Sequence, residues 1–122
     1  MAKKGSILVV DDEEVMRDVL DSLLTAEGYE VELARNGEEG LDKFQQRAFD
    51  LVLLDVFLPG GMNGIEVLRR IRSINPTVKV IMVTGNTDPL LAREALELGA
   101  LAYVDKPFDF DYLKRVVAMA LR

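Results

Sequence analysis

The stretch LVLLD at residues 51–55 places a carboxylate directly after four large apolar residues. Residues 7–10 and 80–83 form equally continuous apolar runs. Such runs are typical of the central strands of a parallel sheet, because helices cover both of its faces. The sequence Glu-Val-Glu-Leu at 30–33 alternates instead, which predicts an edge strand with one face partly wet. The short apolar run 101–104 predicts the opposite edge.

Helix-like segments separate these five runs, so the chain alternates between strands and helices. In residues 15–24 apolar side chains recur at helical spacing, which predicts an amphipathic helix that Gly28 can end. This alternation favours a doubly wound α/β fold with a five-stranded parallel sheet and five helices. With the alternating strand at the edge and right-handed crossovers, the expected strand order is 2-1-3-4-5. Caps for the later helices are predicted at Asn36, Asn63, Asp88 and Asp109.

Polar residues gather at the ends of these predicted strands. Asp11 and Asp12 follow the first strand, and Asp55 follows the third. Thr84 ends the fourth strand, and Lys106 comes shortly after the fifth. Open α/β sheets bind ligands outside the carboxyl ends of their strands, where the strand order reverses. We therefore expect these five side chains to meet at one rim of the sheet.

Three carboxylates in one crevice repel one another, and a divalent cation relieves that conflict. Oxygen ligands in an open, hydrated crevice favour Mg²⁺ over zinc or a soft metal. With the metal held by Asp11 or Asp12 and by one oxygen of Asp55, the other Asp55 oxygen remains available as a nucleophile towards phosphorus. The Lys106 ammonium and the Thr84 hydroxyl can then meet the charge on the transferred phosphoryl oxygens.

Each group also has a simpler explanation. Asp12 is equally suited to cap the following helix, Thr84 to a turn, and Lys106 to a solvated surface charge. Asp50 begins the third strand, about 16 Å from Asp55 at about 3.3 Å per residue, and is excluded from the site. Asp55 is the exception, because a carboxylate that closes an apolar strand is a strong site candidate.

Composition narrows the possible chemistry. The chain has 122 residues, room for one domain, and a formal net charge of −6, which argues against direct binding of nucleic acid. It contains neither Cys nor His, so thiol and imidazole chemistry are excluded. The apolar run 7–10 is too short for a signal peptide or a membrane span. We expect a cytoplasmic protein.

Four motifs resemble the receiver domain of two-component response regulators: ILVVDDE at 7–13, LVLLDVFLP at 51–59, VIMVTG at 80–85 and AYVDKPF at 102–108. The match covers nearly the whole chain, so the resemblance implies one flavodoxin-like receiver domain over residues 1–122. It implies that Asp55 is phosphorylated by a sensor histidine kinase or phosphotransfer protein. It also implies that Asp11 and Asp12 take part in Mg²⁺ binding.

The resemblance assigns further roles. Thr84 and Lys106 would contact the phosphoryl group, and the backbone carbonyl of Phe57 would bind the metal. Tyr103 would turn inward when the Thr84 hydroxyl moves, although from the residues alone Tyr103 is better explained as packing on an edge strand. Lys106–Pro107 would be a cis peptide. Output, and possible homodimer formation, would use the face of the fourth helix, fifth strand and fifth helix.

The loop that follows Asp55 departs from the family pattern. Residues 59–64, PGGMNG, contain one additional residue, which would make this loop more mobile. Phe57 stands two positions after Asp55, and we hypothesise that its bulk slows water attack on a phosphorylated aspartate.

Two other functions stay open from the sequence. An aspartyl-phosphate phosphohydrolase usually needs an acid where Phe57 stands. A receiver-like binding module that is never phosphorylated would not need every chemical position filled. We expect a phosphoacceptor with at most slow self-dephosphorylation, not an enzyme.

Overall fold

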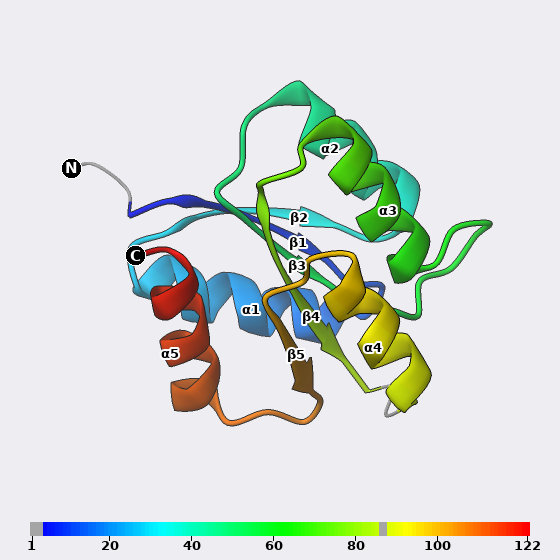
Figure 1. Ribbon diagram of the computed structural model, residues 1–122. Coiled ribbons are helices and arrows are strands. Elements are labelled where there is room, and N and C mark those ends of the chain that lie inside the picture. The colour runs from blue at the N-terminus through cyan, green and yellow to red at the C-terminus, as the bar shows by residue number, and fades with distance from the viewer. Residues whose placement is uncertain (1–3, 86–87) are drawn as a thin grey trace.

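The computed structural model describes residues 4–85 and 88–122, and its centre is a parallel five-stranded sheet (Figure 1). The strand order is β2-β1-β3-β4-β5, which confirms the order predicted from the sequence. All strand pairs are parallel, with Val10 of β1 opposite Ala34 of β2 and Leu54 of β3. The strands are Ser6–Val10 (β1), Glu30–Ala34 (β2), Leu51–Leu54 (β3), Lys79–Thr84 (β4) and Ala102–Asp105 (β5).

In the part of the chain that the structure describes, five helices cover the two faces of the sheet. Helices α1 and α5 lie on one face, and α2, α3 and α4 lie on the other (Figure 1). The fold is therefore the doubly wound three-layer architecture that the alternation of strands and helices predicted. The helices are Glu14–Ala26 (α1), Gly37–Gln46 (α2), Gly64–Ile74 (α3), Pro89–Glu97 (α4) and Phe110–Ala120 (α5).

The continuous apolar strands fill two separate cores. In β3, Leu51 and Leu53 pack towards α1 and α5, whereas Val52 and Leu54 pack towards the three helices of the opposite face. All four side chains are buried, as expected for a strand covered on both sides. The strand β2 lies at the edge of the sheet, as its sequence predicted, but its first four residues are all half-buried and do not alternate in burial. The other edge, β5, begins and ends one residue later than predicted.

Side chains cap four helices at the predicted positions. The side-chain oxygens of Asn36 and Asn63 accept from the backbone N–H groups three residues ahead, and those of Asp88 and Asp109 also accept from the first turn. The cap role considered for Asp12 is wrong, because α1 has Glu13 at its cap position and no side chain among the described residues caps it. Gly28 follows the end of α1 with a φ of 97°, a conformation that glycine adopts readily.

Figure 1 shows every helix lying against the sheet. Within residues 4–85 and 88–122, none of the helices is both long enough and apolar enough to cross a bilayer.

Candidate functional site

The carboxyl ends of the central strands surround a crevice of about 620 Å³. Backbone hydrogen bonds extend the sheet one residue beyond its strands at this rim. The backbone N–H of Asp11 donates to the carbonyl oxygen of Ala34 at 3.0 Å, and the backbone N–H of Asp55 donates to the carbonyl oxygen of Val10 at 3.0 Å. The two carboxylates therefore stand on rigid backbone. The crevice is lined by Asp12, Glu13, Met16, Asp55, Phe57, Thr84, Gly85, Lys106 and Pro107.

The Lys106 ammonium links the acidic residues of this rim. Its Nζ lies 2.6 Å from Asp11 Oδ2 and 3.0 Å from Asp55 Oδ2. A third carboxylate, that of Glu13, accepts from Nζ at 3.1 Å. The backbone N–H of Lys106 donates to Thr84 at 2.9 Å, which fixes the base of the side chain at the end of β4. Strands β1, β3, β4 and β5 thus contribute to one cluster.

Sequence reasoning missed Glu13. The available signal was its position directly after the acidic pair, in the loop that enters the crevice. The Glu13 side chain is 62% exposed, whereas that of Asp11 is only 3% exposed. The contact with Lys106 depends on a side-chain conformation that sequence spacing does not determine.

Burial and pairing shift the pKa values of Asp11 and Lys106. Burial raises the pKa of Asp11 above its ordinary value, against the lowering effects of the Lys106 and Glu13 hydrogen bonds. Burial by itself would lower the pKa of Lys106, but the hydrogen bonds to Asp11 and Asp55 outweigh it and raise that pKa. The lysine is therefore fully charged at neutral pH, and its cation stands between two carboxylates.

The acidic groups fit a hard divalent cation. Asp11, Asp12 and Asp55 each offer one carboxylate oxygen, and these three atoms lie within 4.8 Å of one another. Asp12 is exposed at the mouth, while Asp11 and Asp55 are buried. An all-oxygen donor set open to water on one side matches the preference of Mg²⁺, which retains several water ligands. The type of ligand atom and the closeness of the three carboxylates therefore both suit Mg²⁺.

Phe57 lies beside Asp55 in the lining of the crevice. Its backbone N–H donates to Asp55 Oδ1 at 3.2 Å, while Lys106 contacts Oδ2. Both oxygens of Asp55 are therefore held in defined orientations. Phe57 is 62% exposed, which agrees with a position at the mouth of the crevice.

The two residues expected to switch conformation lie on adjacent strands. Thr84 ends β4 and is completely buried, and Tyr103 pairs with Met82 one strand further out. The half-buried Tyr103 packs against the core beneath α2, α3 and α4. Burial is the largest cause of the raised pKa of Tyr103. The negative charges of Asp105, Asp55 and Asp88 raise it further. The Lys106–Pro107 peptide bond is cis.

The additional residue of the β3–α3 loop is accommodated away from Asp55. Side chains added at Gly60 or Gly61 would meet no atom within 4 Å, and this loop projects from the molecule in Figure 1. At Gly64, by contrast, a Cβ would lie 1.9 Å from the Asp55 carbonyl oxygen. The tip of the loop has space for side chains, although the φ of 90° at Gly60 favours glycine there. The return of the loop to α3 passes against the backbone of Asp55.

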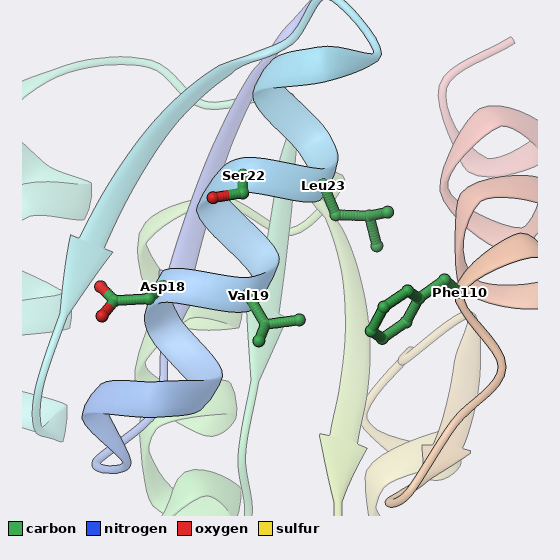
Figure 2. A pocket seen from close by; sticks show the side chains of 5 residues that line it. All are labelled: Asp18, Val19, Ser22, Leu23 and Phe110. Carbon is green, nitrogen blue, oxygen red and sulfur yellow. The ribbon is translucent and has the colours of Figure 1, made fainter.

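Two other regions are separate from this crevice. Asp50 lies at the amino end of β3, where its carboxylate accepts from the N–H of Ser6 at 2.8 Å. Its exclusion from the site agrees with that position. A groove of about 440 Å³ lies between α1 and α5. In it, Val19 and Leu23 of α1 face Phe110 of α5 (Figure 2). Its walls are mainly apolar and lack the convergent acids and lysine of the crevice.

Known proteins resemble this chain in fold and in sequence. The sequence model of the response regulator receiver domain family matches residues 7–118 of this chain. The uncharacterized transcriptional regulatory protein YkoG of Bacillus subtilis is 43% identical over 98% of this chain and 52% of its own length. Sporulation initiation phosphotransferase F of the same organism is 40% identical over 91% of this chain and 89% of its own.

Solved structures of receiver domains have the same fold as this chain. A response regulator receiver domain from Methanospirillum hungatei superposes with a TM-score of 0.93 and 37% identity, covering 99% of this chain and 94% of that one. The chain therefore belongs to the response regulator receiver domain family, as its motifs predicted. It spans about half of YkoG and 26% of the transcriptional regulatory protein ZraR of Klebsiella oxytoca. These longer relatives carry further segments, so the charge of this domain does not decide whether a whole regulator binds nucleic acid.

Proposed function

We propose that this domain is a phosphoryl-accepting switch of a two-component system, with Asp55 as the acceptor. The observation that carries the proposal is the contact of one ammonium, that of Lys106, with both Asp11 and Asp55 at the rim of the sheet. A lysine so placed can neutralise a phosphoryl group bonded to Asp55 without leaving the cluster. The crevice beside it gives a phosphodonor access to the carboxylate.

In the proposed reaction, an Asp55 oxygen attacks the phosphorus of a phosphohistidine on a kinase or phosphotransfer protein. The new O–P bond forms as the N–P bond breaks, and the imidazole nitrogen keeps the electron pair and takes up a proton. Lys106 stabilises the charge on the phosphoryl oxygens, and the Thr84 hydroxyl supplies a further donor. Mg²⁺, held by Asp11, Asp12 and Asp55 with the Phe57 carbonyl as a further ligand, would supply additional charge neutralisation when bound.

The phosphoryl group would act on the fold through Thr84 and Tyr103. A new dianionic group on Asp55 draws the Thr84 hydroxyl towards it and changes the packing available to the half-buried Tyr103 ring. The response would reach the face of α4, β5 and α5, where Leu101 and Met119 are exposed. Homodimer formation through this face, and a cytoplasmic location, stay predictions.

The rival functions have less support. A phosphohydrolase of this kind usually needs an acid two positions after the nucleophilic aspartate, and in this chain Phe57 occupies that position with an apolar ring. A module that is never phosphorylated gives no reason for Lys106 to bridge Asp11 and Asp55 beside an open crevice. We therefore propose an acceptor that at most slowly removes its own phosphoryl group, with a kinase or phosphotransfer protein as its donor.

Intact mass spectrometry tests the proposal. Wild type and Asp55→Asn are incubated with a small phosphodonor, such as acetyl phosphate, with Mg²⁺ or with a chelator. Wild type with Mg²⁺ should gain one phosphoryl group, and the variant and the chelated sample should gain little or none. Equal labelling of wild type and Asp55→Asn would contradict the assignment. A module that is never phosphorylated would gain no mass under any condition.

A further inference from the structure

Arg17 lies on α1, outside the set of residues that the motifs assign to the site. Its guanidinium Nη1 donates to the backbone carbonyl oxygen of Asp11 at 2.8 Å. We propose that Arg17 is a positioning residue for the cation site: it fixes the backbone of the β1–α1 loop so that the carboxylates of Asp11 and Asp12 stay directed at Asp55. This inference rests on the proposed function, because it concerns the same site.

Arg17 completes a set of contacts that holds Asp11 on every side. The Asp11 N–H donates to Ala34, and its Oδ1 accepts from the N–H of Glu13 at 2.9 Å. Its Oδ2 accepts from Lys106 at 2.6 Å. The carbonyl is the remaining polar group of this residue, and it accepts from Arg17. Each of these contacts restricts the orientation of the peptide that leads into Asp12.

Arg17 lies in the first turn of α1, so its contact with the Asp11 carbonyl links the start of this helix to the end of β1. Its backbone N–H donates to Glu13 at 3.0 Å, and Glu13 stands at the cap position without a side-chain cap hydrogen bond within the described chain. The side chain and the backbone of Arg17 therefore both contact the β1–α1 loop, the guanidinium at Asp11 and the N–H at Glu13. Residues that orient metal ligands from outside the ligand set typically change metal affinity by about 10- to 100-fold when replaced.

The charge of Arg17 makes this role testable, because charge and positioning predict opposite effects. A guanidinium near a cation site repels the cation, so its removal should by electrostatics alone strengthen Mg²⁺ binding. If Arg17 positions the loop, its removal should weaken binding despite that gain. The sign of the change therefore distinguishes the two effects.

The experiment measures the Mg²⁺ dissociation constant by calorimetric titration at fixed ionic strength. It compares wild type, Arg17→Met, Arg17→Lys and Arg115→Met, the last of which removes the same charge from an exposed position on α5. We expect Arg17→Met to bind Mg²⁺ roughly tenfold or more weakly. Arg17→Lys, which keeps the charge but not the fork of donors, should lie between Arg17→Met and wild type. Arg115→Met should bind like wild type.

Urea unfolding of each protein shows whether the native state is fully populated in the titration. Unchanged or tighter binding in Arg17→Met, with Arg17→Lys equal to wild type, would overturn the positioning role. If Arg17→Met does not fold, Arg17→Lys decides alone: weaker binding supports the inference, and wild-type affinity contradicts it. Failure of wild type itself to bind Mg²⁺ would instead count against the proposed function, so the two failures are distinguishable.

Discussion

The Asp11 carboxylate at this rim is held where ionisation is costly, because burial raises its pKa. Asp11 is 2% exposed and Asp55 is 6% exposed, and one lysine serves both. Rigid strands carry them there, because their backbone N–H groups continue the hydrogen bonding of the sheet. Sites that hold like charges close together are often less stable than they could be, because function requires those charges. The loss of stability can be measured by replacing single residues.

Asp11→Asn should stabilise the metal-free protein at neutral pH. Burial raises the pKa of Asp11, so the folded state binds its proton more tightly than the unfolded state does. Ionisation of this carboxyl therefore lowers the free energy of unfolding as pH rises from the ordinary carboxyl pKa through the folded one. We expect a higher urea midpoint for Asp11→Asn in chelator at neutral pH, with the advantage disappearing in acid.

The measurement is urea unfolding followed by circular dichroism at a series of pH values. Asp12→Asn, at the exposed neighbouring position, removes the same formal charge and serves as the control. An advantage of Asp11→Asn that persists unchanged in acid would show that its cause is not the ionisation of Asp11.

Phe57→Asn should shorten the lifetime of the phosphorylated state. Phe57 lines the crevice beside Asp55 and is exposed at its mouth. We hypothesise that its apolar ring limits the approach of water to a phosphoryl group on Asp55, whereas an amide can orient a water molecule there. An increase of about threefold in the dephosphorylation rate corresponds to roughly 0.7 kcal/mol of barrier. Loss of the phosphoryl group over time, measured by intact mass, gives the rate. Phe57→Leu should stay close to wild type, and an unchanged rate in Phe57→Asn rejects the idea.

Close contacts between secondary-structure elements hold α3 in place. The turn into α3 is one example: the Gly64 N–H donates to Val56, and its Cα faces the carbonyl of Asp55. The end of α3 is another, because the guanidinium of Arg72 donates to the carbonyls of Leu98 and Gly99 after α4. These contacts join α3 both to the acceptor strand and to α4.

Gly64→Ala should destabilise the fold, while Gly61→Ala should not. A Cβ at Gly64 would lie 1.9 Å from the Asp55 carbonyl oxygen, which forces the backbone of the acceptor residue or of α3 to move. Overpacking of this kind typically costs about 1–3 kcal/mol. At Gly61 the added methyl group meets no atom within 4 Å. Urea unfolding of both variants makes the comparison, and equal midpoints would contradict the close approach.

Arg72→Met should also destabilise the protein, by about 2 kcal/mol or more, because partly buried carbonyls lose a charged donor. Its guanidinium contacts Leu98 at 2.8 Å, Gly99 at 2.9 Å and also Val78. Arg70→Met is the matched control on the same helix, since Arg70 pairs only with exposed Glu66 among the partners that the structure gives it. Thermal unfolding that affects both variants alike would show that the three carbonyl contacts are not the cause.

At the scale of the whole molecule, the pattern of the strands predicted the fold. Continuous apolar runs at β1, β3 and β4 can be buried only between two layers of helices, and the alternating Glu30-Val31-Glu32 segment then takes an edge. The positions of Asp11, Asp55 and Thr84 follow directly from where those strands end. Periodicity contains this information because it reports burial along the chain.

The sequence predicted the long-range side-chain contacts less well. Arg17, Arg72 and Glu13 reach backbone or side-chain partners whose positions depend on the packed helices. Asp12 was equally suited to a cap or a ligand, and only the start of α1 at Glu14 excluded the cap. Spacing along the chain predicts which rim a residue reaches but not the direction of a long, flexible side chain.

The most direct test of the central claim is to locate the phosphoryl group. Wild type is labelled with a small phosphodonor and Mg²⁺ and then treated with borohydride, which reduces an aspartyl phosphate to homoserine. Peptide mass spectrometry identifies the converted residue. The account predicts homoserine at position 55, with Asp11, Asp12 and Glu13 unchanged. Conversion at any of those three acids with Asp55 intact would contradict it.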